Sequence, residues 1–247
     1  MLLLFDVGNT NICITTYEND VIDESITRIT TLVNRSSDEY FLILREMIQL
    51  NKVKNVAISS VVPDVTTILK EMCIKHLNID PLILGPGVKT GVKIVADNPR
   101  EVGADLICDV AGIGDKEALI VDLGTATKYI YVKNKTLKGV VISPGVVVSI
   151  KALSANAALL PEIDIKAPNK VLGNNTINCM QSGVTYGVAS QVDGMILRIK
   201  EEVGNPNLKV IATGGLANLI VPLAKNDIEI DNLLTLRGLL EVYRRNL

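Results

Sequence analysis

Two segments of the chain place an aspartate at the end of an apolar stretch, two residues before a glycine. The first is LLLFDVGNTN at residues 2–11, and the second is ALIVDLGTAT at residues 118–127. A strand that ends in a carboxylate and turns at glycine can hold a metal–phosphate group, because the backbone comes close and exposes N–H groups. One such motif is often only a tight turn. Two copies, one near the start of each half, predict a duplicated fold that closes around one nucleotide.

Two further motifs add chemistry to this pattern. Residues 209–215, KVIATGG, are typical of a strand, a glycine turn and the start of a helix. The glycines could admit an adenosine, and a helix N-terminus offers N–H groups to an anion. Asp105 follows Gly103 beside a loop rich in glycine and proline, residues 85–103, where it could take a proton from an alcohol. The alternative is a carboxylate that starts a helix and interacts favourably with the helix dipole.

Other reactive patterns are incomplete. Residues 85–91, GPGVKTG, lack the Gly-Lys-Thr ending of a P-loop, and neither they nor residues 112–114 complete a dinucleotide-binding motif. His76 is the only histidine, at a helix end where a solvated side chain is expected, and no nucleophile elbow accompanies it. The four cysteines form no CxxC pair, which argues against zinc and disulfides and favours reduced thiols. Proton transfer would therefore depend on carboxylates.

The elements that must position these residues alternate between strands and helices in two similar halves. In the first half we expect strands that end at Asp6 and at 12–17, 21–30, 56–62 and 81–84, and helices at 36–50, 63–77 and about 104–112. In the second half we expect strands at 119–122, 128–132, 138–143 and 209–213, and helices at 144–160, 176–203 and 236–245. This order predicts an α/β protein of two related lobes, residues 1–114 and 115–247.

Composition limits the classes of function. The chain has 247 residues, 48% hydrophobic and 3% aromatic, enough to bury a core in one or two domains. The 25 basic and 27 acidic residues nearly balance, and no basic stripe or aromatic-rich groove indicates a nucleic-acid partner. No apolar run has the length of a membrane helix, and the apolar start before Asp6 is too short for a signal peptide. We therefore expect a cytoplasmic protein with no membrane partner.

Taken in order along the whole chain, these motifs resemble type III pantothenate kinase. The resemblance rests on residues 6–10, 59–63, 85–91, 97–105, 122–127, 175–176, 180–183 and 212–217. It implies the actin-like ATPase (ribonuclease H-like) fold of the acetate and sugar kinase, Hsp70 and actin superfamily, each lobe a mixed sheet flanked by helices. It also implies a cytoplasmic homodimer that phosphorylates pantothenate to 4'-phosphopantothenate with ATP, Mg2+ and a monovalent cation, K+ or NH4+. This reaction is the first step of coenzyme A biosynthesis.

The resemblance also implies roles for single residues. Asp105 would be the general base on the substrate hydroxyl, Asp6 would help to place Mg2+, and Asp122 would bind the monovalent cation. The residues implied to bind ATP are Asp6, Val7, Gly8, Asn9, Thr10, Asn11, Ile12, Cys13, Gly124, Thr125, Thr213 and Gly214. Those implied to bind pantothenate are Ala96, Gly103, Ala104, Asp105, Leu106 and Thr176. Because phosphoryl transfer needs positioning and charge neutralisation, we expect the three aspartates to converge on one crevice between the lobes.

Three positions depart from the family pattern. Ala96 stands where Tyr is usual, Leu106 where Arg is usual, and Lys128 where a second Thr is usual. By resemblance the Arg and the Tyr face pantothenate, and losing an Arg–carboxylate contact of about 1.5–3 kcal/mol would weaken binding by about one to two powers of ten. Lys128 could supply a replacement charge. The departures leave two alternatives: a catalytically impaired nucleotide-binding paralogue with a regulatory role, or a kinase of another small alcohol.

Overall fold

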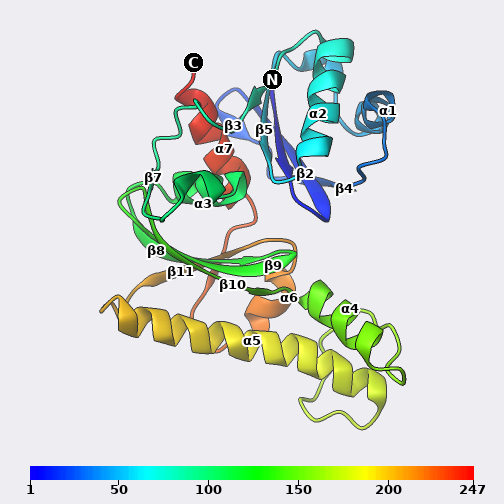
Figure 1. The fold of residues 1–247 in the computed structure, drawn as a ribbon, viewed down its shortest axis with the longest axis vertical. Coiled ribbons are helices and arrows are strands. Elements are labelled where there is room, and N and C mark those ends of the chain that lie inside the picture. Colours follow the sequence, from blue (N-terminus) through cyan, green and yellow to red (C-terminus); the bar gives the residue numbers. More distant parts are fainter. The chain divides into compact units, whose positions relative to one another are not determined.

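The computed structural model describes all residues from Met1 to Leu247, which form two compact units. Unit 1 comprises Met1–Gly114 and Leu233–Leu247, and unit 2 comprises Asp115–Asn232. Each unit is a mixed sheet flanked by helices (Figure 1). The α/β class predicted from the sequence is confirmed. None of the helices combines the length and the hydrophobicity that crossing a bilayer requires.

The sheet of unit 1 is built on the first apolar segment. β1 (Leu2–Val7) pairs antiparallel with β2 (Asn11–Glu18) and parallel with β5 (Asn55–Ser60). The strand order is β3-β2-β1-β5-β6, and β4 pairs with β2. The short strands of this sheet are β3 (Val21–Ile22), β4 (Thr27–Thr30) and β6 (Leu82–Ile83), whereas β7 (Lys93–Ile94) is not part of it.

The predicted strand over residues 21–30 is interrupted between β3 and β4. Asp23 turns the chain there, because its carboxylate accepts the backbone N–H of Ser25 at 2.8 Å. The Thr15 hydroxyl, on β2, donates to the Asp23 carbonyl at 2.6 Å and holds the turn against the sheet. A side-chain contact between strands therefore interrupts what the residue types favour as one strand.

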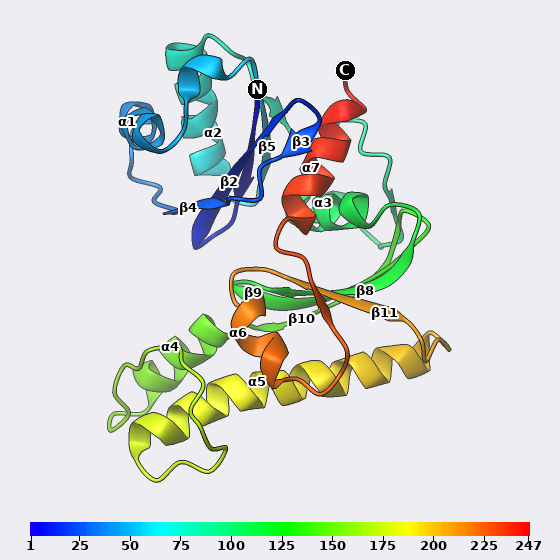
Figure 2. The ribbon, with the colours of Figure 1, turned by 180° about the vertical axis from the view of Figure 1, so that it is seen from behind.

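Helices cover both faces of this sheet (Figures 1 and 2). α1 (Ser37–Met47) and α2 (Pro63–Met72) bury the face that carries Leu3 and Phe5. α3 (Ala104–Ile113) and α7 (Leu234–Arg244) bury the face that carries Leu2 and Leu4. Successive side chains of a strand point to opposite faces, so a strand that is covered on both sides must be apolar throughout.

Local signals start the first two helices where the sequence predicts them. Ser36 caps α1 in a capping box with Glu39, whose backbone N–H donates to the serine hydroxyl and whose carboxylate accepts the Ser36 N–H. α2 begins at Pro63, in the first helical turn where proline is tolerated. The predicted length to residue 77 is reached through a π-helical turn, Cys73–Leu77. Short 3-10 turns lie at Leu50–Lys52, Pro99–Glu101 and Val221–Leu223.

α7 packs in unit 1 although it ends the chain. The division made from the sequence placed residues 233–247 in the second lobe, whereas the structure groups them with unit 1. The apolar stripe of α7, which includes Leu236, Leu239 and Leu240, packs on the α3 side of the first sheet. The segment therefore belongs to the unit whose apolar sheet face it buries. The order of elements along the sequence does not reveal this placement.

The sheet of unit 2 repeats the topology of unit 1. β8 (Glu117–Leu123) pairs antiparallel with β9 (Ala126–Lys133), which pairs antiparallel with β10 (Thr136–Pro144). β11 (Lys209–Thr213) lies parallel to β8 and to β12 (Glu229–Ile230). The order β10-β9-β8-β11-β12 matches β3-β2-β1-β5-β6 in sequence order and direction. The duplication predicted from the two Asp-x-Gly motifs is present as two equivalent sheets.

One face of the second sheet carries the long helix α5 (Thr176–Glu202), and both ribbon views show it along the strands (Figures 1 and 2). Val188, Val192 and Ile196 of α5 pack with Leu119 and Val121 of β8. α4 (Val146–Asn156) and α6 (Ala217–Ile220) join the same cluster. The face of β8 that carries Asp122 is the other one, since side chains alternate along the strand.

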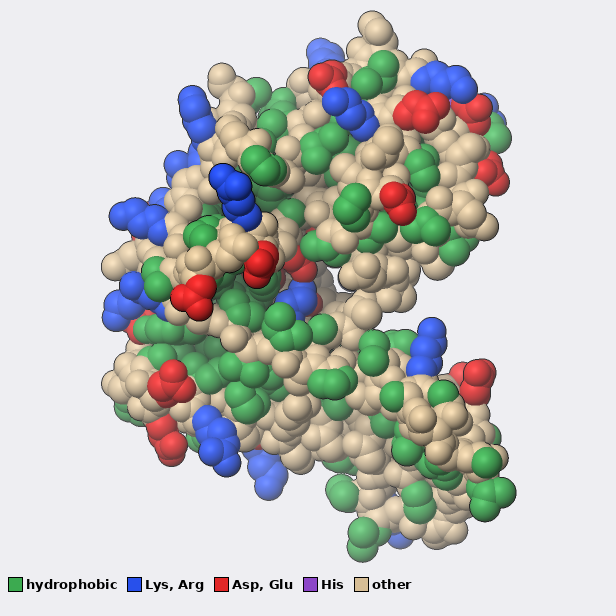
Figure 3. Space-filling view, in the orientation of Figure 1, with side chains coloured by type: hydrophobic (Ala, Val, Ile, Leu, Met, Phe, Trp, Pro, Cys, Tyr) green, Lys and Arg blue, Asp and Glu red, His purple; other side chains and the backbone are tan.

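Apolar side chains remain exposed at the end of unit 2 that holds α4 and the loop before α5 (Figure 3). They include Val148, Leu153, Leu159, Val171 and Leu172. An exposed apolar patch of this kind is typical of a surface that binds another molecule.

Candidate functional site

Unit 1 places Asp6 at the carboxyl end of β1, next to an exposed turn. Asp6 lies opposite Cys13 of β2 and Ser59 of β5 in the two strand registers. The Gly8 N–H then donates to the Asn11 carbonyl at 3.0 Å, which closes the turn, while Asn9, Thr10 and Asn11 are exposed. The turn therefore presents polar side chains to solvent beside a carboxylate.

Asp105 belongs to the same unit and is the second residue of α3. Gly103 precedes the helix as its N-cap, and the Leu106 N–H donates to the Asp105 carboxylate at 2.9 Å. The helix-start interaction that the sequence offered as an alternative is thus present. A Cβ atom on Gly103 would collide with Oδ1 of Asp105. Glycine at 103 therefore leaves room for the carboxylate, and the two roles of Asp105 are compatible.

The buried Cys108 thiol of α3 is subject to the charges of both Asp6 and Asp105. Burial raises the pKa of Cys108 well above its ordinary value. The negative charges of Asp6, Asp109 and Asp105 raise the pKa of the thiol further. A Cβ atom on Gly103 would lie 3.4 Å from Val61, whose N–H donates to the Val7 carbonyl at 3.0 Å, so the start of α3 lies beside the end of β1.

Unit 2 places Asp122 at the equivalent position of its own sheet. Asp122 is the last residue but one of β8, as Asp6 is of β1, and it lies opposite Lys128 of β9 and Thr213 of β11. The Lys128 ammonium group donates to Oδ2 of Asp122 at 2.7 Å. From sequence, Lys128 was a departure from the family pattern that could supply a replacement charge, with no partner named. The signal for its pairing was its place across the short turn that follows Asp122.

Glycine turns enclose the other oxygen of this carboxylate. A Cβ atom on Gly124 would lie 3.4 Å from Oδ1 of Asp122, and one on Gly214 would lie 2.6 Å from it. The Leu216 N–H donates to the Leu123 carbonyl at 3.2 Å and joins the two turns. The predicted nucleotide residues Gly124, Thr213 and Gly214 therefore gather around Asp122, and Thr125 is exposed beside them.

Gly145 belongs to this arrangement, although the sequence analysis gave it no site role. Its N–H donates to the Thr125 carbonyl at 3.2 Å, and a Cβ atom there would collide with the carbonyls of Gly124 and Thr125. The available signal was a Pro-Gly pair directly before a helix. A side chain at 145 would displace the second Asp-x-Gly turn.

Gly214→Ala is expected to lower the free energy of unfolding by about 1–3 kcal/mol, because the residue has φ +94° and its new Cβ would meet Asp122 and the Leu123 backbone. Gly215→Ala is the matched control, since nothing lies within 4 Å of a Cβ there and its φ is not positive. It should change stability by no more than about 0.5 kcal/mol. Urea unfolding followed by circular dichroism measures both. Equal losses in the two variants would contradict the geometry of the turn.

The other residues that were predicted to bind ATP or pantothenate differ in how far their side chains are exposed. Val7 and Ile12 are buried in the core of unit 1, so only their backbone is available to a nucleotide. Ala104 packs against the apolar cluster of unit 1 that includes residues of α3 and α7. Ala96 is exposed in the loop before α3. Leu106 is only 8% exposed, so it fills a buried position that an Arg could not occupy in the same way.

Thr176 is the exposed first residue of α5, which Asn175 caps by accepting the Asn178 N–H at 2.9 Å. The first turn of this helix borders a pocket of about 670 Å³ whose lining includes Lys166, Lys170 and Asn178. Thr176 thus lies beside a hollow that is lined by the two lysines and also by Asp164.

His76 is not the solvated side chain that the sequence suggested. It stacks on Phe41 with ring centroids 4.2 Å apart, and its Nε2 lies 2.6 Å from Asp38. The expectation is wrong because α1 packs beside the turn that follows α2 and brings both partners to the ring. His76 has a structural role in this corner of unit 1.

The structure offers no complete set of protein ligands for a metal ion. No group of three or more His, Cys, Asp or Glu side chains lies close enough to bind a metal ion alone. A divalent cation at Asp6 would take its other ligands from phosphates and water, as Mg2+ commonly does. A single strand-end carboxylate beside an exposed turn fits a metal that arrives with a nucleotide.

Comparison with known proteins decides the family. The family model for type III pantothenate kinase matches residues 2–198. The chain belongs to the type III pantothenate kinase family. A type III pantothenate kinase of Acholeplasma laidlawii is 50% identical over 248 residues, which cover 100% of both chains. One from Exiguobacterium sp. is 45% identical over 255 residues, with 100% of this chain and 99% of that protein covered. The resemblance found in the motifs is confirmed.

Structural neighbours of this pantothenate kinase family member agree on the fold. A solved structure from Sinorhizobium meliloti, described as a candidate 2-dehydro-3-deoxygalactonokinase, matches with a TM-score of 0.65 at 12% identity. The match covers 99% of this chain and 96% of that one. At this identity the likeness concerns architecture alone, and it confirms the actin-like fold of the sugar kinases.

Proposed function

We propose that this chain transfers the γ-phosphoryl group of ATP to the hydroxyl of pantothenate, which gives 4'-phosphopantothenate. The observation that carries the proposal is 40–50% identity, over the whole chain, to proteins named type III pantothenate kinase. Unit 1 supports it with a candidate base, Asp105, on α3, which packs against the sheet that carries the candidate metal ligand, Asp6. In unit 2, the predicted ATP-binding residues Gly124 and Gly214 lie against Asp122.

In this reaction the substrate oxygen forms a bond to the γ-phosphorus while the bond from that phosphorus to the bridging oxygen of ADP breaks. Asp105 takes the hydroxyl proton, so that no free alkoxide has to form. Asp6 would hold an Mg2+ ion that arrives with ATP, and this ion would supply the positive charge that offsets the charge of the phosphates. The exposed turn at Gly8, Asn9 and Thr10 offers N–H and hydroxyl groups to the phosphate oxygens.

We also propose that the chain acts as a cytoplasmic homodimer, in which the exposed apolar patch at α4 and before α5 is covered by a second copy. Leu159 and Leu172 are among its most exposed members. Light scattering on the purified chain, with Leu159→Ser and Leu172→Ser together as the variant, tests this. A wild-type monomer at micromolar concentration would refute it.

The activity is tested by mass-spectrometric detection of 4'-phosphopantothenate after incubation of the chain with ATP, Mg2+ and pantothenate. We expect product with pantothenate and none when pantothenate is omitted. A panel of small alcohols without a carboxylate serves as the comparison. ATP binding without turnover at millimolar pantothenate would favour the impaired paralogue, and preferred turnover of another alcohol would favour the other kinase.

A further inference from the structure

The chain supplies its own cation to the Asp122 carboxylate. Nζ of Lys128 lies 2.7 Å from Oδ2, within the ordinary range of a charge-assisted hydrogen bond. The side chain of Lys128 is 16% exposed and that of Asp122 is 15% exposed, so the pair is largely removed from solvent. Solvent and salt screen such a pair less than they screen a fully exposed pair.

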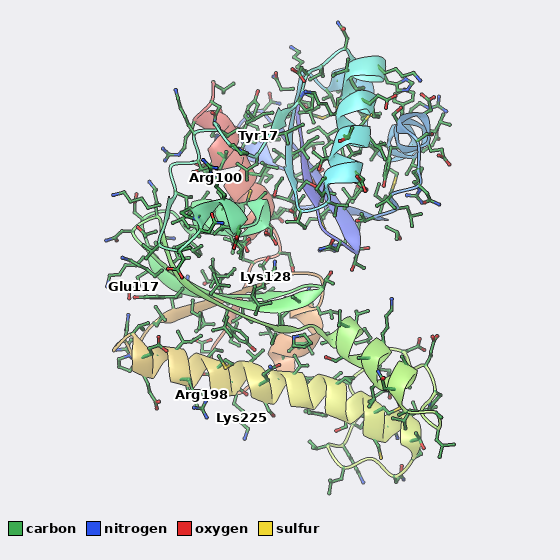
Figure 4. The ribbon with its side chains drawn as sticks, in the orientation of Figure 1. Tyr17, Arg100, Glu117, Lys128, Arg198 and Lys225 are labelled. Carbon is green, nitrogen blue, oxygen red and sulfur yellow. The ribbon has the colours of Figure 1, made fainter.

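Strand register fixes this pairing. Asp122 and Lys128 are direct partners across the antiparallel β8–β9 pair, so their side chains point to the same face of the sheet. Figure 4 shows Lys128 on the face opposite to α5, where the alternation along β8 also puts Asp122. The two groups are thus held together by backbone hydrogen bonds as well as by their charges.

The equivalent position in unit 1 is different. Asp6 has the same place in β1 that Asp122 has in β8, and its antiparallel partner is Cys13, which carries no positive charge. The duplicated sheets therefore differ in one chemical respect at this site. Only the second carboxylate has a cation built into the neighbouring strand.

The family resemblance implies that a monovalent cation binds at Asp122. The residues present at Asp122 do not fit such an ion. Oδ2 is bonded to an ammonium group, and Oδ1 lies against the glycine turns at 124 and 214. A second cation at this carboxylate would be repelled by Lys128 and would find the charge of Asp122 already neutralised. Lysine carries a compact point charge, which resembles K+ or NH4+ in this respect.

We infer that Lys128 replaces the monovalent cation in this chain. K+ is then not bound at Asp122, and neither nucleotide binding nor phosphoryl transfer requires K+ or NH4+. The catalytic part of this inference rests on the proposed function, whereas the part that concerns cation and nucleotide binding does not.

The test compares wild type with Lys128→Thr, which restores the residue usual in the family. The matched control is Lys133→Thr, because Lys133 pairs with Glu117 of β8 at 3.0 Å, also as a direct partner, at the opposite end of the same two strands (Figure 4). Each protein is studied in KCl and in tetramethylammonium chloride at equal ionic strength. The readouts are calorimetric binding of Mg–ATP, 205Tl NMR with Tl+ as the K+ probe, and turnover.

Wild type and Lys133→Thr should show the same Mg–ATP affinity and turnover in both salts, within about twofold, and no specific Tl+ signal. Lys128→Thr should lose at least tenfold in Mg–ATP affinity in tetramethylammonium chloride, because an uncompensated carboxylate would then lie among the glycine turns that are predicted to bind ATP. KCl should restore most of this loss, and Tl+ should bind the variant.

Tl+ binding to the wild type, or a tenfold gain of wild-type Mg–ATP affinity in KCl, would overturn the inference. A folded Lys128→Thr variant whose Mg–ATP affinity is the same with and without K+ would also overturn the inference. If Lys128→Thr does not fold, Lys128→Met serves as the variant without the charge. If neither variant folds, the wild-type measurements decide alone. Absence of turnover in every buffer would refute the proposed function and leave the Tl+ and Mg–ATP results valid.

Discussion

Asp105→Asn is expected to lower kcat by about 10²–10⁴-fold and to change Mg–ATP affinity by no more than about twofold, if Asp105 acts as a general base. Asparagine keeps the shape of the side chain and can still accept the Leu106 N–H, which Asp105 accepts at 2.9 Å. It cannot take up the substrate proton. The variant therefore separates the helix-start interaction from the chemistry, and single-turnover assays with pantothenate measure the difference.

Asp64→Asn is the matched control for this variant. Asp64 is the second residue of α2, as Asp105 is of α3, and both helices have ten residues. Each substitution removes a helix-dipole interaction of about 0.3–1 kcal/mol, so the two should lower stability equally. Only Asp105→Asn should lose turnover. Undiminished turnover in Asp105→Asn would leave Asp105 with its helix-start role alone.

The sequence predicts most elements of this fold because their signals are local. The apolar segment before Asp122 gives a strand at 117–123 where 119–122 was expected, and α5 extends over 176–202 where 176–203 was expected. The capping box at Ser36 and the proline at 63 mark the starts of α1 and α2. Both signals are contained in a few neighbouring residues. Strand-end aspartates followed by glycine were recognisable for the same reason.

What the sequence did not reveal depends on contacts between distant segments. The pairing of Lys128 with Asp122 depends on the register of two strands, and a shift by one residue would put Lys128 on the opposite face. The burial of Leu106 and the stacking of His76 on Phe41 likewise need neighbours that no local pattern names. The membership of α7 in unit 1 is the largest such case.

The α3–α7 packing has one decisive contact. A Cβ atom on Gly238 of α7 would collide with the carbonyl of Cys108 on α3, and one on Gly112 of α3 would lie 2.6 Å from the carbonyl of Leu234. The two helix backbones therefore touch where both residues are glycine. Because α3 carries Asp105 one turn before Cys108, this contact also fixes the candidate base.

Gly238→Ala should lower the free energy of unfolding by about 3 kcal/mol or more, since a backbone must move to admit the methyl group. Gly187→Ala in α5 is the control, because nothing lies within 4 Å of a Cβ there and alanine should gain about 0.5–1 kcal/mol in an open helix. Urea unfolding should thus show a lower free energy of unfolding for Gly238→Ala and a higher one for Gly187→Ala. An unchanged unfolding midpoint for Gly238→Ala would mean that α7 does not hold α3, and the position of Asp105 would need another cause.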